Sequence, residues 1–388
     1  GRGHSDPSSK LRSDGGVFLA MITLTDVKKS FGDNHVLRGV NLEIARGTSM
    51  VIIGGSGTGK SVALKSVLGL VVPDSGMIMV DGQNAATAER DAFLARFGML
   101  FQGGALFDSL PVWPNVAFRL LRGALKRPKD EAREIAIEKL RRVGLKADVA
   151  DRFPAELSGG MQKRVGLARA IAAEPEIIFF DEPTTALDVT VQAQIIELIK
   201  ELREKLSMAI VWITHDLGVV AGIADRVAVM YGGQIVQFGT PRELFERPNH
   251  AFVGYFIGSP GMNLVEVERW EGGVVFNSTR VPLDDSINAI LNESTSTNIK
   301  IGIRPEFVHV WEEPTDGAFE CNLKVVEDLG TYKILTIELD GVEFKARIEE
   351  DAPVPAQKVY ISFPEQWLKV YLDEYLVDPN FEALEGSQ

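Results

Sequence analysis

Short apolar runs alternate with amphipathic stretches over the first 240 residues of the chain. Three runs are suited to buried strands because they are apolar and rich in β-branched or aromatic residues: 50–53, 177–180 and 209–213. Apolar residues also recur at three- and four-residue steps, which predicts a helix over about residues 190–206. Strands that alternate with helices in this way indicate a mainly parallel sheet.

After about residue 260 the pattern changes to short strands separated by turn residues. Residues 332–338 and 342–348 flank an Asp-Gly pair, which predicts a β-hairpin. Residues 358–363 and 367–372 predict another strand pair. This part of the chain therefore indicates a small all-β domain of the barrel type.

These patterns divide the 388 residues into two domains, as the length suggests. A stretch rich in Pro, Gly and Asn, 248–263, indicates the boundary region. Residues 1–20 lack an initiating Met and are rich in Gly, Ser and Asp, so we interpret them as a tail, a tag remnant or upstream translated sequence before Met21. The expected parts are a tail over 1–20, an α/β domain over 21–245, a linker over 246–261 and a β-barrel domain over 262–388.

Composition and charge exclude several classes of protein. With 45% hydrophobic and 24% charged residues the chain is an ordinary globular protein, and no apolar run approaches the ~18 residues of a membrane span. A single cysteine, Cys321, excludes a disulfide framework and a multi-cysteine metal site. Residues 241–388 hold 12 basic against 27 acidic residues, a net −15, whereas residues 1–240 are at +2. The acidic half argues against a surface for nucleic acid or anionic lipid.

A phosphate-binding loop follows the strand at 50–53. Residues 54–61 match the pattern G-x-x-x-x-G-K-[ST] at every fixed position, between that strand and a helix predicted over 61–70. The glycines let successive backbone N–H groups point at phosphate oxygens, and the helix N-terminus adds a positive dipole end. We expect Lys60 to reach the β- and γ-phosphates and Ser61 to bind Mg²⁺.

Two acidic residues, Asp181 and Glu182, follow directly after the strand at 177–180. Such a strand places them at the carboxyl edge of the sheet, near the phosphate-binding loop. Asp181 suits a contact with Mg²⁺, and Glu182 suits the general base that polarises the attacking water. A helix N-cap explains such a pair equally well when it stands alone, but downstream of a phosphate-binding loop the catalytic interpretation is favoured.

A second candidate anion site begins at Ser158, a good helix N-cap before a helix predicted to about residue 172. The next two residues, Gly159 and Gly160, lower helix propensity, which is easier to explain if a ligand approaches the backbone closely. Because residues 54–61 already cover one side of a nucleotide, a second anion site indicates a nucleotide shared between two subunits.

Over residues 22–240 the chain resembles the ATP-binding subunit of ABC transporters. Asp188 matches the family's intersubunit loop, and Phe31 stands where the family stacks an aromatic ring on adenine. Five elements occur in the family's order: the loop 54–61, a glutamine switch at Gln102, the signature 157–162, the strand end 177–182, and His215 after the strand 209–213.

The resemblance implies a role for each matched residue. Gln102 would contact Mg²⁺ or the attacking water, and His215 would bond the γ-phosphate and orient Glu182. Asp188 would couple one site to the other across a dimer, and Ser158 would help to close the partner subunit's site. The expected catalytic residues are Glu182, His215, Gln102 and Lys60. The expected metal ligands are Ser61, Gln102 and Asp181. The expected nucleotide-binding residues are Phe31, Gly54, Gly55, Ser56, Gly57, Thr58, Gly59, Lys60, Ser61, Val62, Ser158, Gly159, Gly160 and Asp188.

The fold class implied is an α/β P-loop NTPase of the ABC type, mainly a parallel sheet with antiparallel β and helical subdomains, followed by a small all-β OB-like domain. The implied cofactors are ATP and Mg²⁺. The implied partners are a second copy of the chain or a paralogous ATPase, and transmembrane permease subunits. No nucleic acid is expected, and contact with the membrane is expected only through the permease, at the cytoplasmic face of the inner membrane.

The residues resemble more than one ABC subfamily. Val62 and residues 100–110 resemble the ATPases of Mce-type phospholipid transporters, and residues 181–240 resemble oligopeptide importers. Residues 256–263 and 302–306 resemble sugar and glycerol-phosphate importers, which carry a C-terminal OB-like domain. That domain is the largest signal, so we expect an importer ATPase of the carbohydrate or polyol type, with lipid transport and peptide import as alternatives. A natural mosaic, an engineered hybrid and a divergent member all stay open.

A soluble ABC ATPase of translation or DNA repair is the alternative of a different class. The translation type normally joins two ATPase domains, whereas this chain has one phosphate-binding loop. The repair type inserts a long coiled coil between that loop and the strand ending at Phe180, and too few residues lie between them. A transport ATPase is therefore favoured.

Overall fold

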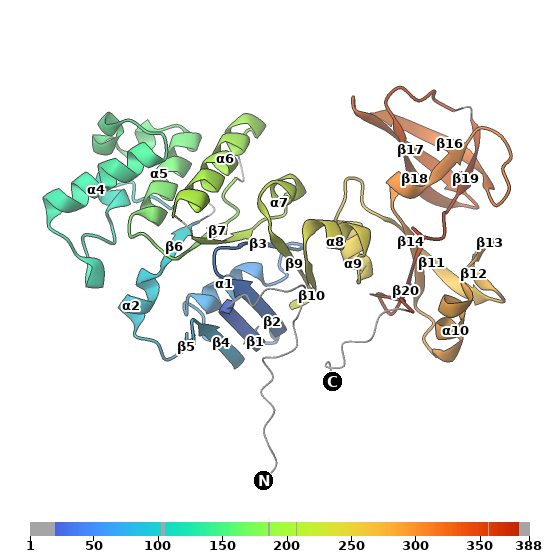
Figure 1. The fold of residues 1–388 in the computed structure, drawn as a ribbon, viewed down its shortest axis with the longest axis horizontal. Coiled ribbons are helices and arrows are strands. Elements are labelled where there is room, and N and C mark those ends of the chain that lie inside the picture. Colours follow the sequence, from blue (N-terminus) through green and yellow to red (C-terminus); the bar gives the residue numbers. More distant parts are fainter. Residues whose placement is uncertain (1–19, 102–104, 185–186, 207, 356, 380–388) are drawn as a thin grey trace, which may run out of the picture. The chain divides into compact units, whose positions relative to one another are not determined.

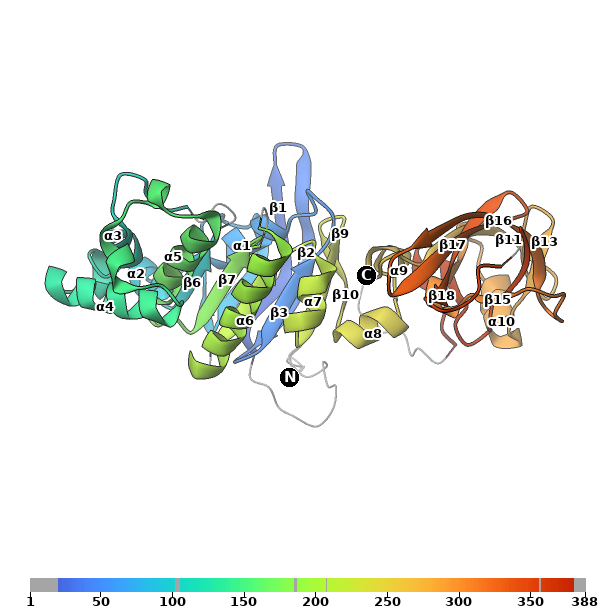
Figure 2. The same cartoon turned by 90° about the horizontal axis from the view of Figure 1, so that it is seen from above.

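The structure is a computed structural model, and it describes residues 20–101, 105–184, 187–206, 208–355 and 357–379. The chain forms two compact units that divide between residues 235 and 236. Figures 1 and 2 show the helices and strands of both units.

The main sheet of the N-terminal unit has six strands in the order β10-β9-β3-β8-β7-β6, and the division between the units falls within its edge strand β10. The register of β9, β3, β8, β7 and β6 is parallel throughout, and every residue of β3 and β8 is buried. The strands are β3 (Ser49–Ile53), β6 (Phe97–Leu100), β7 (Ile177–Asp181), β8 (Ala209–Ile213), β9 (Arg226–Tyr231) and β10 (Gln234–Gly239). The three predicted strands and the parallel sheet are thus confirmed.

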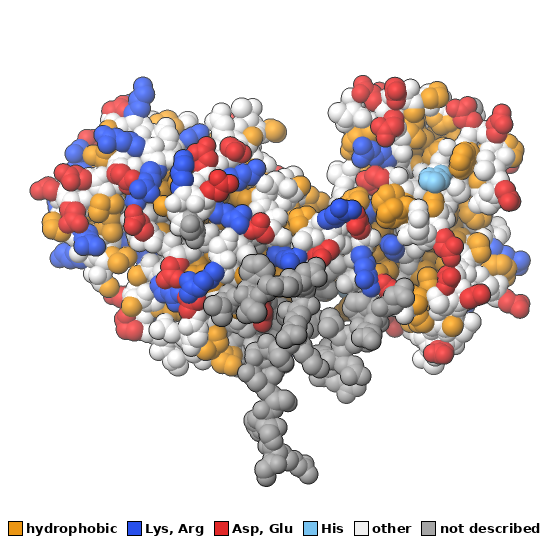
Figure 3. All heavy atoms as spheres, in the orientation of Figure 1, with side chains coloured by type: hydrophobic (Ala, Val, Ile, Leu, Met, Phe, Trp, Pro, Cys, Tyr) orange, Lys and Arg blue, Asp and Glu red, His pale blue; other side chains and the backbone are white. Residues whose placement is uncertain are grey.

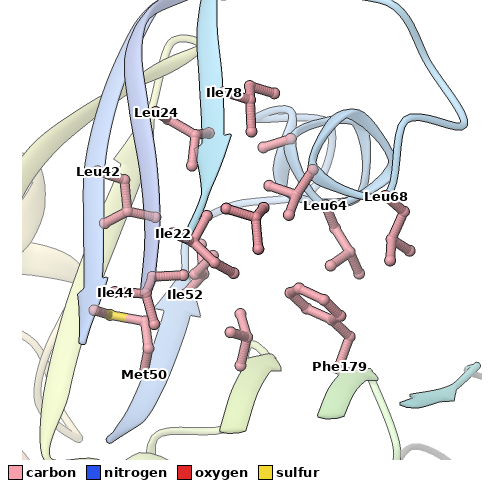
Figure 4. Close-up of a cluster of buried hydrophobic side chains, with 14 of the residues drawn as sticks. Ile22, Leu24, Leu42, Ile44, Met50, Ile52, Leu64, Leu68, Ile78 and Phe179 are labelled. Carbon is pink, nitrogen blue, oxygen red and sulfur yellow. The ribbon is translucent and has the colours of Figure 1, made fainter. Parts of the chain in front are cut away.

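A second, antiparallel sheet packs on the same core in the order β2-β1-β4-β5. Its strands are β1 (Ala20–Phe31), β2 (Asn34–Ala45), β4 (Ser75–Val80) and β5 (Gln83–Asn84). Figure 4 shows how apolar side chains from this sheet face helix α1 (Lys60–Val67) and the parallel sheet. Among them, Ile22 and Leu24 of β1 lie opposite Leu64 of α1 and Phe179 of β7. Burial of these side chains positions α1, and with it the loop before α1, over the sheet.

The helices of this unit cover the sheet and form a helical subdomain. Besides α1 they are α2 (Arg90–Ala95), α3 (Val112–Val116), α4 (Lys129–Arg142), α5 (Gly159–Ile171), α6 (Val189–Leu206) and α7 (Leu217–Ile223). Helices α3, α4 and α5 pack against one another. The predicted helix at 190–206 is confirmed by α6. Helix α1 ends three residues before the predicted residue 70, because Gly69 adopts φ 63° in the left-handed region that terminates helices.

The C-terminal unit contains two antiparallel sheets that share one core. One has the order β13-β12-β11-β14-β20-β21, and the other has the order β15-β19-β16-β17-β18. The strands are β11 (Asn263–Trp270), β12 (Gly273–Phe276), β13 (Thr279–Pro282), β14 (Ile299–Ile303), β15 (His309–Trp311), β16 (Phe319–Asp328), β17 (Tyr332–Leu339), β18 (Val342–Glu349), β19 (Lys358–Ser362), β20 (Lys369–Leu372) and β21 (Tyr375–Leu376). Acidic side chains are spread over the visible face of this unit (Figure 3), in line with its negative charge.

The predicted hairpin is confirmed by β17 and β18, which pair from Leu339↔Val342 outward. Asp340 and Gly341 between them have φ 52° and 81°. Positive φ at both central residues is the requirement of a type I′ turn, and Asp-Gly meets it with little steric cost.

The second predicted strand pair is wrong. Strand β19 pairs with β15 and β16, whereas β20 pairs with β14 and β21 in the other sheet. Val359 of β19 and Val370 of β20 instead bury their side chains in the same core from two different sheets. Apolar residues show that a strand has a buried side, but they do not show which strand it pairs with.

The sequence also missed a helix in the β domain, α10 (Asp285–Glu293). The carboxylate of Asp284 caps it by accepting a hydrogen bond from Ser286 N at 2.8 Å, and Leu291 packs into the domain core. The domain is therefore mainly β, with α10 packed on its core.

The residues expected to form a linker pack against the β domain. Helices α8 (Pro241–Glu246) and α9 (Ala251–Phe256) belong to the C-terminal unit. The fully buried Arg304 donates from Nε to the carbonyl of Phe245 at 2.7 Å, and burial lowers its pKa to about 10. Tyr371 Oη donates to the carbonyl of Pro248 at 3.1 Å. These contacts favour counting the segment with the β domain, and the predicted boundaries stay predictions.

No helix in the described ranges is both long and apolar enough to cross a bilayer.

Candidate nucleotide-binding site

The phosphate-binding loop joins β3 to α1, and its geometry requires glycine at two positions. At Gly54, with φ 153°, an added Cβ would lie 2.2 Å from the carbonyl oxygen of Met230. At Gly59, with φ 102°, it would lie 2.9 Å from the carbonyl oxygen of Val36. Gly59 is also the N-cap residue of α1 and offers no side chain to cap the helix. The first N–H groups of α1 are therefore open to an anion.

Lys60 lies over this loop. Its Nζ donates hydrogen bonds to the carbonyl oxygens of Gly54 and Gly55, both at 2.8 Å. Burial lowers the pKa of Lys60, and the charges of Glu182 and Asp181 act in the opposite direction. The ammonium group is thus held at the place where the loop would receive phosphate oxygens.

Ser61 and Asp181 meet next to the loop. Ser61 Oγ donates to Asp181 Oδ1 at 3.3 Å. Burial raises the pKa of Asp181, and the charge of neighbouring Glu182 raises it further. A divalent cation would offset this unfavourable burial of negative charge, and a hydroxyl with a carboxylate is an oxygen donor set that Mg²⁺ prefers. The two residues therefore fit a magnesium ion.

Glu182 and His215 are hydrogen-bonded to each other at the ends of β7 and β8. His215 Nδ1 lies 3.0 Å from Glu182 Oε1 and 2.9 Å from Oε2. The backbone of Glu182 has φ 50°, a left-handed conformation that is uncommon for a residue with a side chain, and its N–H donates to the carbonyl of Ile213 at 3.0 Å. Such a conformation persists when the surroundings enforce it and is typical of functional sites.

The two glycines after Ser158 differ in their surroundings. Ser158 Oγ accepts a hydrogen bond from Met161 N at 3.3 Å and caps α5. A Cβ on Gly160 would lie 3.0 Å from Val191 Cγ1 of α6, whereas a Cβ on Gly159 would meet nothing within 4 Å. The close contact with Val191 of α6 thus explains why residue 160 is a glycine. Of the two glycines, Gly159 is the one with open space for a ligand.

Asp188 stands before α6, where its Oδ1 accepts a hydrogen bond from Val191 N at 2.9 Å. The residue is exposed, and the next one, Val189, is 85% exposed. Helix capping is therefore a local role of Asp188 that the sequence analysis did not include. Gln102, the expected glutamine switch, lies outside the described residues.

Phe31 ends β1 and is 52% exposed, with Lys29 Nζ at 5.4 Å from the ring centroid. The carboxylate of Asp74 accepts hydrogen bonds from Ser30 N at 2.6 Å and from Lys29 Nζ at 2.7 Å. The sequence analysis missed Asp74, because no local pattern connects residue 74 with residue 31.

Replacing Asp74 with alanine is expected to weaken ATP binding. Asp74→Ala removes the acceptor for the two groups directly before Phe31, so the KM for ATP should rise about three- to tenfold with kcat unchanged. Steady-state phosphate release against ATP concentration measures both constants. Asp33→Ala, in the neighbouring turn, is the matched control and should behave as the wild type. A KM equal to that of the wild type in Asp74→Ala would remove Asp74 from the support of Phe31.

Comparisons with known proteins decide the family. The ABC transporter family model matches residues 37–185, and the MalK OB fold domain model matches residues 258–308. The sn-glycerol-3-phosphate import ATP-binding protein UgpC 2 of Agrobacterium fabrum is 36% identical over 351 residues, which cover 89% of this chain and 91% of that protein. The chain belongs to the ATP-binding subunits of ABC transporters. It is an ATPase coupled to transport.

Further relatives agree with this assignment. The trehalose/maltose import ATP-binding protein MalK of Thermococcus litoralis is 33% identical over 350 residues, with 87% of this chain and 93% of that protein covered. A dimeric, post-hydrolysis ATP-binding cassette, MJ0796 bound to ADP and Pi, matches with a TM-score of 0.51 at 32% identity, over 57% of this chain and 98% of that chain. The structure of cbiO1 from Clostridium perfringens, part of an ABC transporter complex, matches with a TM-score of 0.54 at 30% identity, over 59% and 92%.

These comparisons confirm the predicted fold class, an ABC ATPase followed by an OB-like domain. They also confirm the expectation of an ATPase of the carbohydrate or polyol importer type.

Proposed function

We propose that this chain hydrolyses magnesium-bound ATP at the site formed by the phosphate-binding loop, Asp181, Glu182 and His215, and thereby powers the import of a carbohydrate, a polyol or their phosphate ester through a separate permease. The observation that carries the proposal is the contact between Glu182 and His215, at 2.9 to 3.0 Å, beside the hydrogen-bonded pair of Ser61 and Asp181. The solute class is supported by the printed names of the glycerol-phosphate and trehalose/maltose relatives.

The residues of the site have complementary chemical roles in this proposal. The open N–H groups at the start of α1 and the ammonium of Lys60 would neutralise charge on the phosphate oxygens. Glu182 would accept the proton of the attacking water as general base. His215 bonds Glu182 through Nδ1, which leaves Nε2 on the other side of the ring to meet the γ-phosphate. The hydrogen bond thus orients the Glu182 carboxylate and the His215 ring together.

Ser61 and Asp181 would hold the magnesium ion. When bound, the ion neutralises the charge that develops on the β- and γ-phosphate oxygens. The 3.3 Å distance between Ser61 Oγ and Asp181 Oδ1 supports their binding of one cation.

A second ATPase subunit, either another copy or a paralogue, would complete each site. Ser158, Gly159 and Asp188 are the residues that we propose to meet the nucleotide and residues of that subunit. The open space around Gly159 supports close approach of a phosphate to the backbone there. The subunit would act at the cytoplasmic face of the membrane, in contact with the permease.

Recovery of the permease tests this function. The full chain carrying an affinity tag is purified in mild detergent from its native membrane, and co-purifying proteins are identified by mass spectrometry, with the tag alone as control. We expect a permease pair of the carbohydrate or polyol importer type. A lipid-type or peptide-type permease would overturn the solute class. Recovery of no permease by a chain that still hydrolyses ATP would overturn the role in transport.

A further inference from the structure

A hydrogen bond joins the starts of two helices that flank the catalytic pair. Gln192, in the first turn of α6, donates from Nε2 to Oδ2 of Asp216, the N-cap of α7, at 2.6 Å. The two residues are 24 positions apart in the sequence, and both are half-buried. Helices α6 and α7 lie side by side on one face of the parallel sheet (Figure 2).

At the start of α7, the hydrogen bond from Gln192 ends on Asp216, whose own segment is already held by other hydrogen bonds. Asp216 Oδ1 accepts a hydrogen bond from Gly218 N at 2.8 Å, and Asp216 N donates to Thr214 Oγ1 at 3.0 Å. Thr214 is buried, and its own N–H donates to the carbonyl of Ile52 at 3.3 Å. His215 stands between these two residues, so the backbone that carries its ring is held on both sides.

At the start of α6, Gln192 is itself hydrogen-bonded to Asp188, the residue directly before the helix. Gln192 N donates to the carbonyl of Asp188 at 2.9 Å, and Val191 N donates to Asp188 Oδ1 at the same distance. Gln192 thus lies one helical turn after Asp188 and is hydrogen-bonded to its backbone. Its side chain therefore links the exposed Asp188 segment to the residue next to His215.

We infer that Gln192 is a positioning residue for ATP hydrolysis, which couples the Asp188 segment to the orientation of His215 against Glu182. The inference rests on the proposed function of the site. A shift of the start of α6, as a second subunit meets Asp188, moves Asp216 through this hydrogen bond and so moves the ring. Asp216 is charged and Gln192 is neutral, so the bond is of the stronger, charge-assisted kind.

Variants of the full chain test the inference. In Gln192→Ala we expect kcat for ATP hydrolysis to fall about five- to tenfold, with KM for ATP within about twofold of the wild type. Gln192→Arg returns a donor to the Asp216 carboxylate and should recover most of the lost kcat. Gln194→Ala is the matched control, because Gln194 is exposed on the same helix and bonds Arg164 instead. It should keep the kcat of the wild type.

The outcomes separate this inference from the proposed function. A wild-type chain that does not hydrolyse ATP overturns the proposed function. An active wild type with unchanged kcat in Gln192→Ala overturns the inference alone. A loss of kcat that Gln192→Arg does not recover, or that accompanies a lower Tm, also overturns it, because the role is then structural. If Gln192→Ala does not fold, Gln192→Glu keeps the shape without the donor and should show the same loss of kcat.

Discussion

Glu182→Gln is expected to reduce ATP turnover about 100- to 10,000-fold, the range of a lost general base. The amide keeps the shape of the side chain and an oxygen that can accept from His215 Nδ1, but it does not accept the proton of water. Binding should survive, since Lys60 and the loop amides are unchanged. Phosphate release measures turnover, and a nucleotide titration measures binding. With ATP bound and not hydrolysed, size-exclusion chromatography should show a trapped dimer.

Glu204→Gln is the control for this variant. Glu204 is an exposed glutamate of α6, so Glu204→Gln makes the same chemical change and should leave turnover unchanged. Rapid turnover in Glu182→Gln would remove Glu182 from the role of base. Loss of both binding and turnover would instead show that the carboxylate is needed to hold the site together.

Lys60→Ala is expected to weaken ATP binding about 100-fold, because truncating one partner of a buried charge contact leaves the other partner uncompensated. In the structure Lys60 Nζ has 2.8 Å contacts with the loop carbonyls of Gly54 and Gly55. Alanine removes the cation that a phosphate would meet and leaves both carbonyl oxygens without that donor. Isothermal titration calorimetry with ATP measures the change in Kd, and a thermal melt checks that the variant folds.

Lys65→Ala is the matched control, since Lys65 is an exposed lysine in the last turn of the same helix, α1. It should bind ATP like the wild type. An ATP affinity that Lys60→Ala leaves intact would contradict the assignment of residues 54–61 as the phosphate-binding loop.

The sequence predicted the elements whose signals are local. The glycine pattern of the phosphate-binding loop specifies backbone conformations within eight residues, and the structure shows why Gly54 and Gly59 are needed there. Asp340 and Gly341 specify a turn by their own tolerance of positive φ. The periodicity behind α6 reports one buried face of one helix. Each of these signals acts between residues that are close along the chain.

Pairing between distant strands was not predictable in the same way. Strands β19 and β20 are close in sequence and both are rich in apolar residues, yet they lie in different sheets across one core. Short apolar strands of this kind fit a hairpin and two facing sheets equally well. The choice depends on which neighbours complete each sheet, and those neighbours, β14 and β16, come from elsewhere in the chain.

The sequence by itself determined that the chain is an ABC-type ATPase with an OB-like domain, and it named the residues of the candidate site. Only the tertiary structure showed that Asp74 supports the backbone before Phe31, that Glu182 meets His215 from a left-handed backbone, and that Gln192 reaches Asp216. The physical reason is that such contacts join residues far apart in sequence, and the packing of the sheets and helices decides which side chains meet.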